Sequence, residues 1–243
     1  MLKKIRIQIA FIYVALISFL YLFVAILRPF YHNHVYYVGK LIGLGRYIIG
    51  VRFKLFNKEL LDQHPPCVII SNHQHNIDVF FGGLISPKRT VTIGKRAIFW
   101  IPFFGLMYYL TGNILINRKN KKSAFGTMDE AAKEIKRRQL SVWIMAEGTR
   151  SQGRGLLPFK KGAFITAIKA EVPIYLVAIS EYHKTLNFNK IVSGNVYANV
   201  IGPISTTGLT LNDVESLRAK TENIMREEVS KMNQLALENS KKS

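Results

Sequence analysis

A long apolar segment covers residues 7–27, in which Gln8 and Ser18 are the only clearly polar members. As a helix it would be about 31 Å long, close to the hydrocarbon thickness of a bilayer. The run is longer than the apolar part of a secretory signal peptide, and no small-residue cleavage pattern follows it. Because it is apolar on every side, contact with lipid is favoured over burial as a core helix. The sequence therefore predicts a membrane-inserted N-terminal helix.

The next stretch, residues 28–50, mixes aromatic and cationic side chains with short apolar pairs. Its tyrosines are Tyr31, Tyr36 and Tyr37, and its cations include Lys40 and Arg46. Tyrosine rings favour the headgroup level of a membrane, and long cationic side chains can reach water from an apolar surface. This pattern predicts a helix at headgroup depth and no second span. We therefore expect membrane-anchoring helices over residues 1–50 and a globular domain over residues 51–243.

The charge balance narrows the possible partners. The chain has 34 Lys and Arg against 15 Asp and Glu, a net charge of +19, yet 49% of it is hydrophobic and 12% aromatic. That aromatic content excludes a disordered basic tail. An excess of this size favours an anionic neighbour such as phospholipid, nucleic acid or an acidic carrier protein. Cys67 is the single cysteine, which excludes an internal disulfide and a zinc finger.

From residue 51 onward, short apolar runs alternate with helical patterns. Strands are predicted at residues 67–70, 90–93, 140–145 and 174–179. Helices are predicted at residues 79–85, 123–139, 164–170 and 214–235, the last as an amphipathic helix that closes the chain. Strands that alternate with helices are typical of α/β folds, so we expect a layered α/β domain.

A histidine and an aspartate follow the first of these strands. His73 lies where the strand ends, and Asp78 lies where the next helix should begin. If the histidine is in the loop, the carboxylate can accept the Nδ1 proton of the imidazole and leave Nε2 as a base. The alternative is that Asp78 or Asn76 caps the helix and has no chemical role.

The same segment could also be part of a metal site. His73, His75 and Asp78 carry donor atoms that ligate zinc. A complete site needs further ligands, and of the other histidines two lie in the membrane-proximal stretch. The ligand set is incomplete, so we expect no metal.

A second polar cluster follows the strand at residues 140–145. Gly148 allows a close approach of the backbone to a ligand, Thr149 offers a hydroxyl, and Arg150 offers a planar fork suited to phosphate. Lys160 and Lys161 precede another helix and add anion-binding capacity. The alternative is a solvated turn with a surface ion pair.

Four short blocks occur in order along the chain. They are Asn72-His73-Gln74 with Asp78, Gly94-Lys95 with Asn117-Arg118, Glu147-Gly148-Thr149-Arg150-Ser151, and Val172-Pro173-Ile174. Together they resemble the 1-acylglycerol-3-phosphate acyltransferases over residues 65–205. The resemblance implies a single α/β glycerolipid-acyltransferase-like domain, with a central mixed sheet flanked by helices and preceded by N-terminal membrane helices.

The resemblance also implies a reaction. A fatty acyl group passes from acyl-CoA or acyl-acyl carrier protein to the 2-hydroxyl of 1-acyl-sn-glycerol-3-phosphate (lysophosphatidic acid), giving phosphatidic acid. His73 takes the hydroxyl proton while Asp78 orients it, with no covalent intermediate, metal or cofactor. The residues implied for substrate binding are Lys95, Arg118, Glu147, Gly148, Thr149 and Arg150. Among them the cations hold the acceptor phosphate, and Glu147 orients these cations or a hydroxyl. Cys67 lies inside a strand and is interpreted as a core residue.

Partners and location follow from the resemblance and the charge. We expect membrane phospholipids, lysophosphatidic acid and an acyl-CoA or acidic acyl carrier protein as partners, and no nucleic acid. The basic cluster at residues 118–138 is a candidate docking surface for the carrier, with a solvated helix face or attraction to the membrane as alternatives. The bacterial members imply the inner (cytoplasmic) membrane, with the catalytic body facing the cytoplasm.

Two questions stay open at this point. The length of the apolar run favours a span, whereas Lys3, Lys4 and Arg6 before it favour a helix that stays in the inner leaflet. Another acceptor is also possible, namely glycerol-3-phosphate, a lysophospholipid or a lipid A precursor. From a different class, a membrane-tethered nucleic-acid binder would suit the charge but lacks a binding motif.

Overall fold

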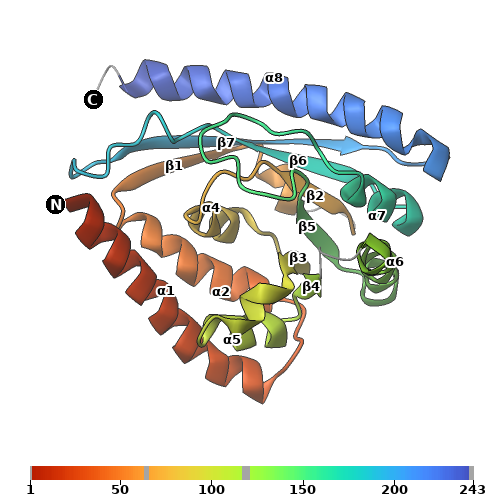
Figure 1. The fold of residues 1–243 in the computed structure, drawn as a ribbon, viewed down its shortest axis with the longest axis horizontal. Helices are drawn as coiled ribbons and strands as arrows, with labels where there is room; N and C mark the ends of the chain where they lie inside the picture. Colours follow the sequence, from red (N-terminus) through yellow and green to blue (C-terminus); the bar gives the residue numbers. More distant parts are fainter. Residues whose placement is uncertain (1, 63–65, 117–120, 241–243) are drawn as a thin grey trace.

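A mixed seven-stranded sheet forms the centre of the molecule (Figure 1). The structure, a computed structural model, describes residues 2–62, 66–116 and 121–240. The strands are β1 (Val51–Phe56), β2 (Val68–Ser71), β3 (Thr90–Lys95), β4 (Ile114–Ile116), β5 (Ser141–Met145), β6 (Ile174–Ile179) and β7 (Gly194–Ile204). Their order in the sheet is β1-β7-β6-β2-β5-β3-β4. The prediction of a mixed sheet flanked by helices is confirmed.

The direction of the strands decides where chemistry can take place. β6 and β7 are antiparallel, whereas the neighbouring pairs β6–β2, β2–β5, β5–β3 and β3–β4 are parallel. The carboxyl ends of β6, β2, β5 and β3 therefore meet at one edge of the sheet. Loops at that edge are where open α/β sheets bind their ligands.

Helices cover both faces of the sheet. The α-helices are α1 (Leu2–Leu27), α2 (His34–Gly43), α3 (Glu59–Asp62), α4 (Asp78–Ile85), α5 (Phe104–Leu110), α6 (Lys121–Arg138), α7 (Gly162–Ala170) and α8 (Val214–Ser240). Short 3₁₀ helices are η1 (Leu44–Arg46), η2 (Arg96–Trp100) and η3 (Leu211–Asp213). Helices α6, α7 and α8 share one core with the sheet, and α1, α2, α4 and α5 share the other.

The central strands are buried on both faces, which is why they are continuous apolar runs in the sequence. Along β6, Ile174 and Leu176 contribute to the core under α7 and α8, while Tyr175 and Val177 contribute to the core under α4. Successive side chains point to opposite faces of a strand, so one apolar run supplies both cores.

The N-terminal helices are stacked on α4. Gly39 of α2 lies so close to Gly83 of α4 that a Cβ on Gly39 would be 3.0 Å from the Gly83 carbonyl oxygen. The two helix backbones therefore touch. Helix α1 is the outermost layer and packs on α2 and α5 (Figure 1). By length and composition it is the one helix of the described residues that could cross a membrane.

Candidate active site

Two loops at the carboxyl edge of the sheet are joined by backbone hydrogen bonds. The Ser151 N–H donates to the His73 carbonyl oxygen at 2.8 Å, and the Gln152 N–H donates to the Gln74 carbonyl oxygen at 3.1 Å. The loop after β5 is thereby aligned with the loop after β2. This pairing brings the two polar clusters predicted from the sequence to one place.

His73 and Asp78 are in direct contact. Nδ1 of His73 lies 2.6 Å from Oδ2 of Asp78. His73 is in the loop and Asp78 is the first residue of α4, which is the arrangement that the sequence required. The carboxylate is 3% exposed and the imidazole 24%. With a carboxylate as acceptor, Nδ1 carries the ring proton, and Nε2 keeps its lone pair as a base.

The Asp78 carboxylate folds back onto the loop that precedes its helix. Oδ2 also accepts hydrogen bonds from the N–H groups of Gln74 at 2.6 Å and His75 at 3.1 Å. The N-cap position is occupied by Ile77, which makes no side-chain cap. The Asn76 side chain accepts a hydrogen bond from the Arg150 guanidinium. Asp78 thus fixes the loop around His73, and Asn76 contacts the second polar cluster.

Tyr182 is a site residue that the sequence analysis missed. It follows β6, and its phenol donates to Oδ1 of Asp78. Burial, and then the neighbouring Asp78 carboxylate, raise the pKa of Tyr182, so the phenol stays a neutral donor. The sequence offered one signal for this role, because Tyr182 lies three residues after the predicted strand at 174–179.

Two buried amides attach the His73 loop to the end of β6. The Asn72 side chain donates to the Ile179 carbonyl oxygen at 2.8 Å and accepts from the Ile179 N–H at 2.9 Å. The Gln74 side chain donates to the Ser180 carbonyl oxygen at 2.9 Å and accepts from the Tyr182 N–H at 3.1 Å. Both amides donate to and accept from the backbone, so they hold the loop in one conformation.

Glu147 lies beneath the site. It is 1% exposed, and its two carboxylate oxygens accept from the His73 N–H at 2.6 Å and the Leu157 N–H at 2.9 Å. Burial raises the pKa of Glu147, and these two backbone hydrogen bonds oppose the rise. The resemblance implied that Glu147 orients cations or a hydroxyl. In the described residues its hydrogen bonds instead position the backbone of His73 and of the loop after β5.

Four of the five remaining predicted binding residues lie around the same edge. Gly148 has a φ of +70°, which favours glycine, and its Cα faces the stem of Lys160. Thr149 is exposed, and Arg150 is held by Asn76. Lys95 is exposed at the carboxyl end of β3. The remaining predicted cation, Arg118, lies outside the described residues.

Two other chemistries have little support. Cys67 is fully buried, and burial raises the pKa of its thiol to about 12, so a thiolate nucleophile is unavailable. Among the described residues, no group of three or more His, Cys, Asp and Glu side chains could hold a metal ion.

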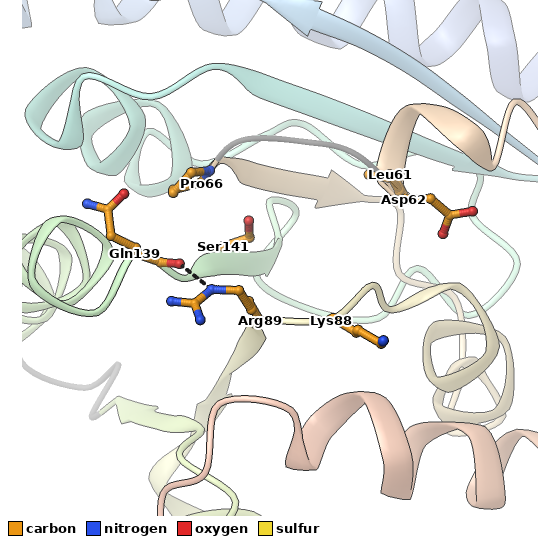
Figure 2. A pocket seen from close by; sticks show the side chains of 7 residues that line it. All are labelled: Leu61, Asp62, Pro66, Lys88, Arg89, Gln139 and Ser141. Carbon is orange, nitrogen blue, oxygen red and sulfur yellow. Dashed lines mark hydrogen bonds between the residues drawn. The ribbon is translucent and has the colours of Figure 1, made fainter.

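A cavity of about 280 Å³ lies away from this site (Figure 2). It is lined in part by Arg89 and Ser141, which lie where β3 and β5 begin, so it is at the amino edge of the sheet. The Arg89 guanidinium donates to the carbonyl oxygens of Gln139 at 3.1 Å and Arg138 at 2.8 Å, which end α6. Its cation is thus used to close a helix, as is common at helix C-termini.

Comparisons with known proteins agree with this architecture. The model of the Acyltransferase family matches residues 52–180. The 1-acyl-sn-glycerol-3-phosphate acyltransferase of Escherichia coli is 36% identical over 232 residues, covering 96% of this chain and 95% of that protein. The enzyme of the same name from Haemophilus influenzae is 36% identical over 237 residues, covering 96% and 98%. The crystal structure of the 1-acyl-sn-glycerophosphate (LPA) acyltransferase from Thermotoga maritima matches 94% of this chain and 97% of its own, with a TM-score of 0.65 and 20% identity.

The fold and the family model together define the class as acyltransferase. The chain therefore belongs to the acyltransferase family and, within it, to the 1-acyl-sn-glycerol-3-phosphate acyltransferases. The resemblance read from the four blocks is confirmed. The bacterial relatives and the apolar helix α1 also indicate an association with membranes.

Proposed function

We propose that this chain transfers a fatty acyl group from acyl-CoA or acyl-acyl carrier protein to the 2-hydroxyl of 1-acyl-sn-glycerol-3-phosphate, forming phosphatidic acid. The contact between His73 and Asp78 carries the proposal, because it supplies an oriented base at the carboxyl edge of the sheet. The names of the relatives support this acceptor.

The proposed mechanism uses one proton transfer in each direction. Nε2 of His73 takes the proton of the 2-hydroxyl as that oxygen attacks the thioester carbonyl carbon. The Asp78 carboxylate stabilises the imidazolium that forms. The tetrahedral intermediate then expels the thiolate, and the imidazolium returns the proton to sulfur. The ester bond forms as the thioester bond breaks, so neither a covalent enzyme intermediate nor a metal is required.

The cations at the same edge would bind the acceptor phosphate. Asn76 directs the Arg150 guanidinium, and a guanidinium binds phosphate oxygens in pairs. Lys95 comes from the neighbouring part of the edge and is exposed. Gly148, with its positive φ, lies beside the stem of Lys160, which adds a third cation near this edge. The basic end of α6 is farther from this site. It lies where β5 begins, at the opposite edge of the sheet, so docking of an acidic acyl carrier protein there would not place the thioester beside His73.

An acceptor panel tests this proposal. Purified protein is assayed with acyl-CoA and acyl-acyl carrier protein donors against 1-acyl-sn-glycerol-3-phosphate, glycerol-3-phosphate, a lysophospholipid without a free phosphate and a lipid A precursor. We expect the first acceptor to give the highest kcat/KM. A higher value for any other acceptor would replace it as the substrate.

We also propose that the protein lies in one leaflet of the bacterial inner membrane, with the catalytic edge facing the cytoplasm. Two polar contacts attach α1 to the rest of the molecule, one to the loop before β7 and one to α2. Near its start, Arg6 donates to the Ile191 carbonyl oxygen at 2.7 Å, and near its end the Tyr21 hydroxyl lies 2.9 Å from Nδ1 of His34. These contacts favour a helix that lies along the body over one that projects through the bilayer.

A further inference from the structure

Exposed apolar side chains are unevenly distributed over the described residues. Most of the large ones belong to α1 and to the stretch from Phe30 to Tyr47. A second group lies more than fifty residues further along the chain, at Phe99, Trp100, Ile101, Phe103 and Leu106. We call residues 99–106, which join η2 to α5, the Trp100 turn. The Trp100 residue itself is 79% exposed.

The Trp100 turn is continuous with the surface of α1. The rings of Phe103 and Phe19 meet edge to face with centroids 5.1 Å apart. Beside them, the ring of Tyr109 contacts both Phe99, at 6.0 Å, and Phe30, at 5.6 Å. The two sequence segments therefore present one apolar face, on the side of the sheet opposite α8 (Figure 1).

The turn is built so that its apolar side chains stay outside. Phe103 has a φ of +60°, a conformation that a bulky residue adopts only when its surroundings impose it. Gly105 lies against η2 so closely that a Cβ would be 2.0 Å from the Phe99 carbonyl oxygen. The close contact of Gly105 with Phe99 thus fixes the backbone of the turn, while the side chains of Trp100 and Ile101 remain exposed. A soluble surface gains nothing from this arrangement, because exposed apolar patches favour association.

Charge identifies the partner. Lys95 and Arg96 are exposed at the start of η2, directly beside the turn, and the chain has a net charge of +19. Tryptophan next to cations is the combination found where proteins meet the headgroups of a bilayer. An anionic lipid leaflet offers both an apolar layer for Trp100 and negative charge for the two cations.

We propose that the Trp100 turn inserts into the same anionic leaflet as α1 and forms a second point of attachment. β3 ends at Lys95, and η2 leads from there into the Trp100 turn. Insertion of the turn would therefore hold the carboxyl edge of the sheet, with His73, at headgroup level. The acceptor could then reach the site without leaving the leaflet. The inference rests on the proposed function only in placing α1 in a leaflet.

The chain contains its own reporter for a test. It has two tryptophans, Trp100 and Trp143, and Trp143 is 3% exposed and donates to Ser71 inside the core. Full-length protein is placed in vesicles of phosphatidylethanolamine and phosphatidylglycerol, with or without acyl chains brominated at defined depths. We expect bromine to quench the fluorescence, shallow positions most strongly, and the vesicles to shield it from aqueous iodide.

Two variants serve as controls. Trp100→Phe leaves only Trp143 and should lose the bromine quenching, while keeping acyl transfer. Leu237→Trp in that background adds an indole at an exposed site on α8, where 51% of the leucine is exposed. Iodide should quench this indole and bromine should not.

The outcomes separate this inference from the proposed function. Iodide quenching of Trp100 in vesicles as strong as that of the Leu237→Trp indole, in protein that binds vesicles and transfers acyl groups, would overturn the inference alone. Shielding together with inactivity on the acceptor panel would overturn the proposed function alone. Shielding that depends on protein concentration, and not on lipid, would show that a second copy covers the turn and would also overturn the inference.

Discussion

The Tyr182 phenol donates to one oxygen of the Asp78 carboxylate, and Nδ1 of His73 lies 2.6 Å from the other. The Asp78 carboxylate is almost fully buried, and each of its two oxygens has a fixed hydrogen-bond partner. A donor on Oδ1 draws negative charge away from Oδ2. Tyr182 is in this way positioned to set both the orientation of Asp78 and the strength of its interaction with the imidazole.

Tyr182→Phe should lower kcat about tenfold or more, because a hydrogen bond to a charged group contributes roughly 1.5–3 kcal/mol. The Asp78 carboxylate would then lose the donor that fixes its Oδ1 and would be free to turn away from the imidazole. Tyr197→Phe, on β7, serves as control. A purely structural role of Tyr182 would lower the melting temperature and leave the kcat of the folded enzyme unchanged.

His73→Ala should abolish turnover and leave the protein folded, since loss of a general base costs about 10²–10⁴ in rate. Asp78→Asn should also be severe, because an amide cannot stabilise an imidazolium. Steady-state rates and the thermal melting curve of each purified variant measure the two effects separately. His75→Ala is the matched control, because it is the backbone N–H of His75 that contacts Asp78. If His75→Ala were inactive and His73→Ala active, the base would be His75.

Arg150→Ala should lower kcat/KM for the acceptor by about ten- to a hundredfold, the equivalent of roughly 1.5–3 kcal/mol. The apparent affinity for the acyl donor should change little. Arg150→Lys should restore only part of the loss, because an ammonium group lacks the planar fork. Varying each substrate at saturating levels of the other gives both constants. A defect confined to the donor would assign Arg150 to the thioester carrier.

Activity should survive removal of divalent metals. The proposed proton transfers need only His73 and Asp78, and the described residues offer no ligand cluster. Enzyme treated with a chelator and passed into metal-free buffer should retain its kcat. Loss of activity that zinc alone restores would mean that the metal-site interpretation of His73, His75 and Asp78 was the right one.

The N-terminus of α1 should be inaccessible from outside the cell. In a Cys67→Ser background, Leu2→Cys is labelled in intact cells with an impermeant thiol reagent. We expect no labelling from the outer face and full labelling after the cells are opened, because α1 is attached to the body through Arg6. Labelling in intact cells would establish a transmembrane α1 and contradict the one-leaflet arrangement.

The strands that the sequence predicted are those covered on both faces. Residues 67–70, 90–93, 140–145 and 174–179 all lie within or next to observed strands, because burial on both sides requires a continuous apolar run. β1, β4 and β7 were missed, and β4 has only three residues. β1 alternates apolar residues with Arg52 and Lys54, and β7 contains polar residues such as Asn199, so their apolar runs are broken. Their place is set by pairing with each other, which a local pattern does not contain.

The same limit applies to the site. The contact of His73 with Asp78 was predictable because the two residues are close in sequence and the helix starts at Asp78. Tyr182 is 104 residues from Asp78, and its contact depends on β6 lying beside β2. The link from Arg150 to Asn76 depends in turn on β5 lying on the other side of β2. Strand order was not readable from the sequence, so these contacts were not either.

The backbone contact between Gly39 and Gly83 limits how the protein can be shortened. Residues 51–243 contain the whole sheet, and a boundary near residue 50 is an obvious place to remove the membrane-anchoring helices. That cut would strip α2 from α4 and leave Phe80, now 3% exposed, without cover. α4 begins with Asp78, so the exposed face would belong to the helix that supports the reaction. We expect the shortened chain to aggregate, which makes the N-terminal segment part of the folding unit and not a detachable anchor.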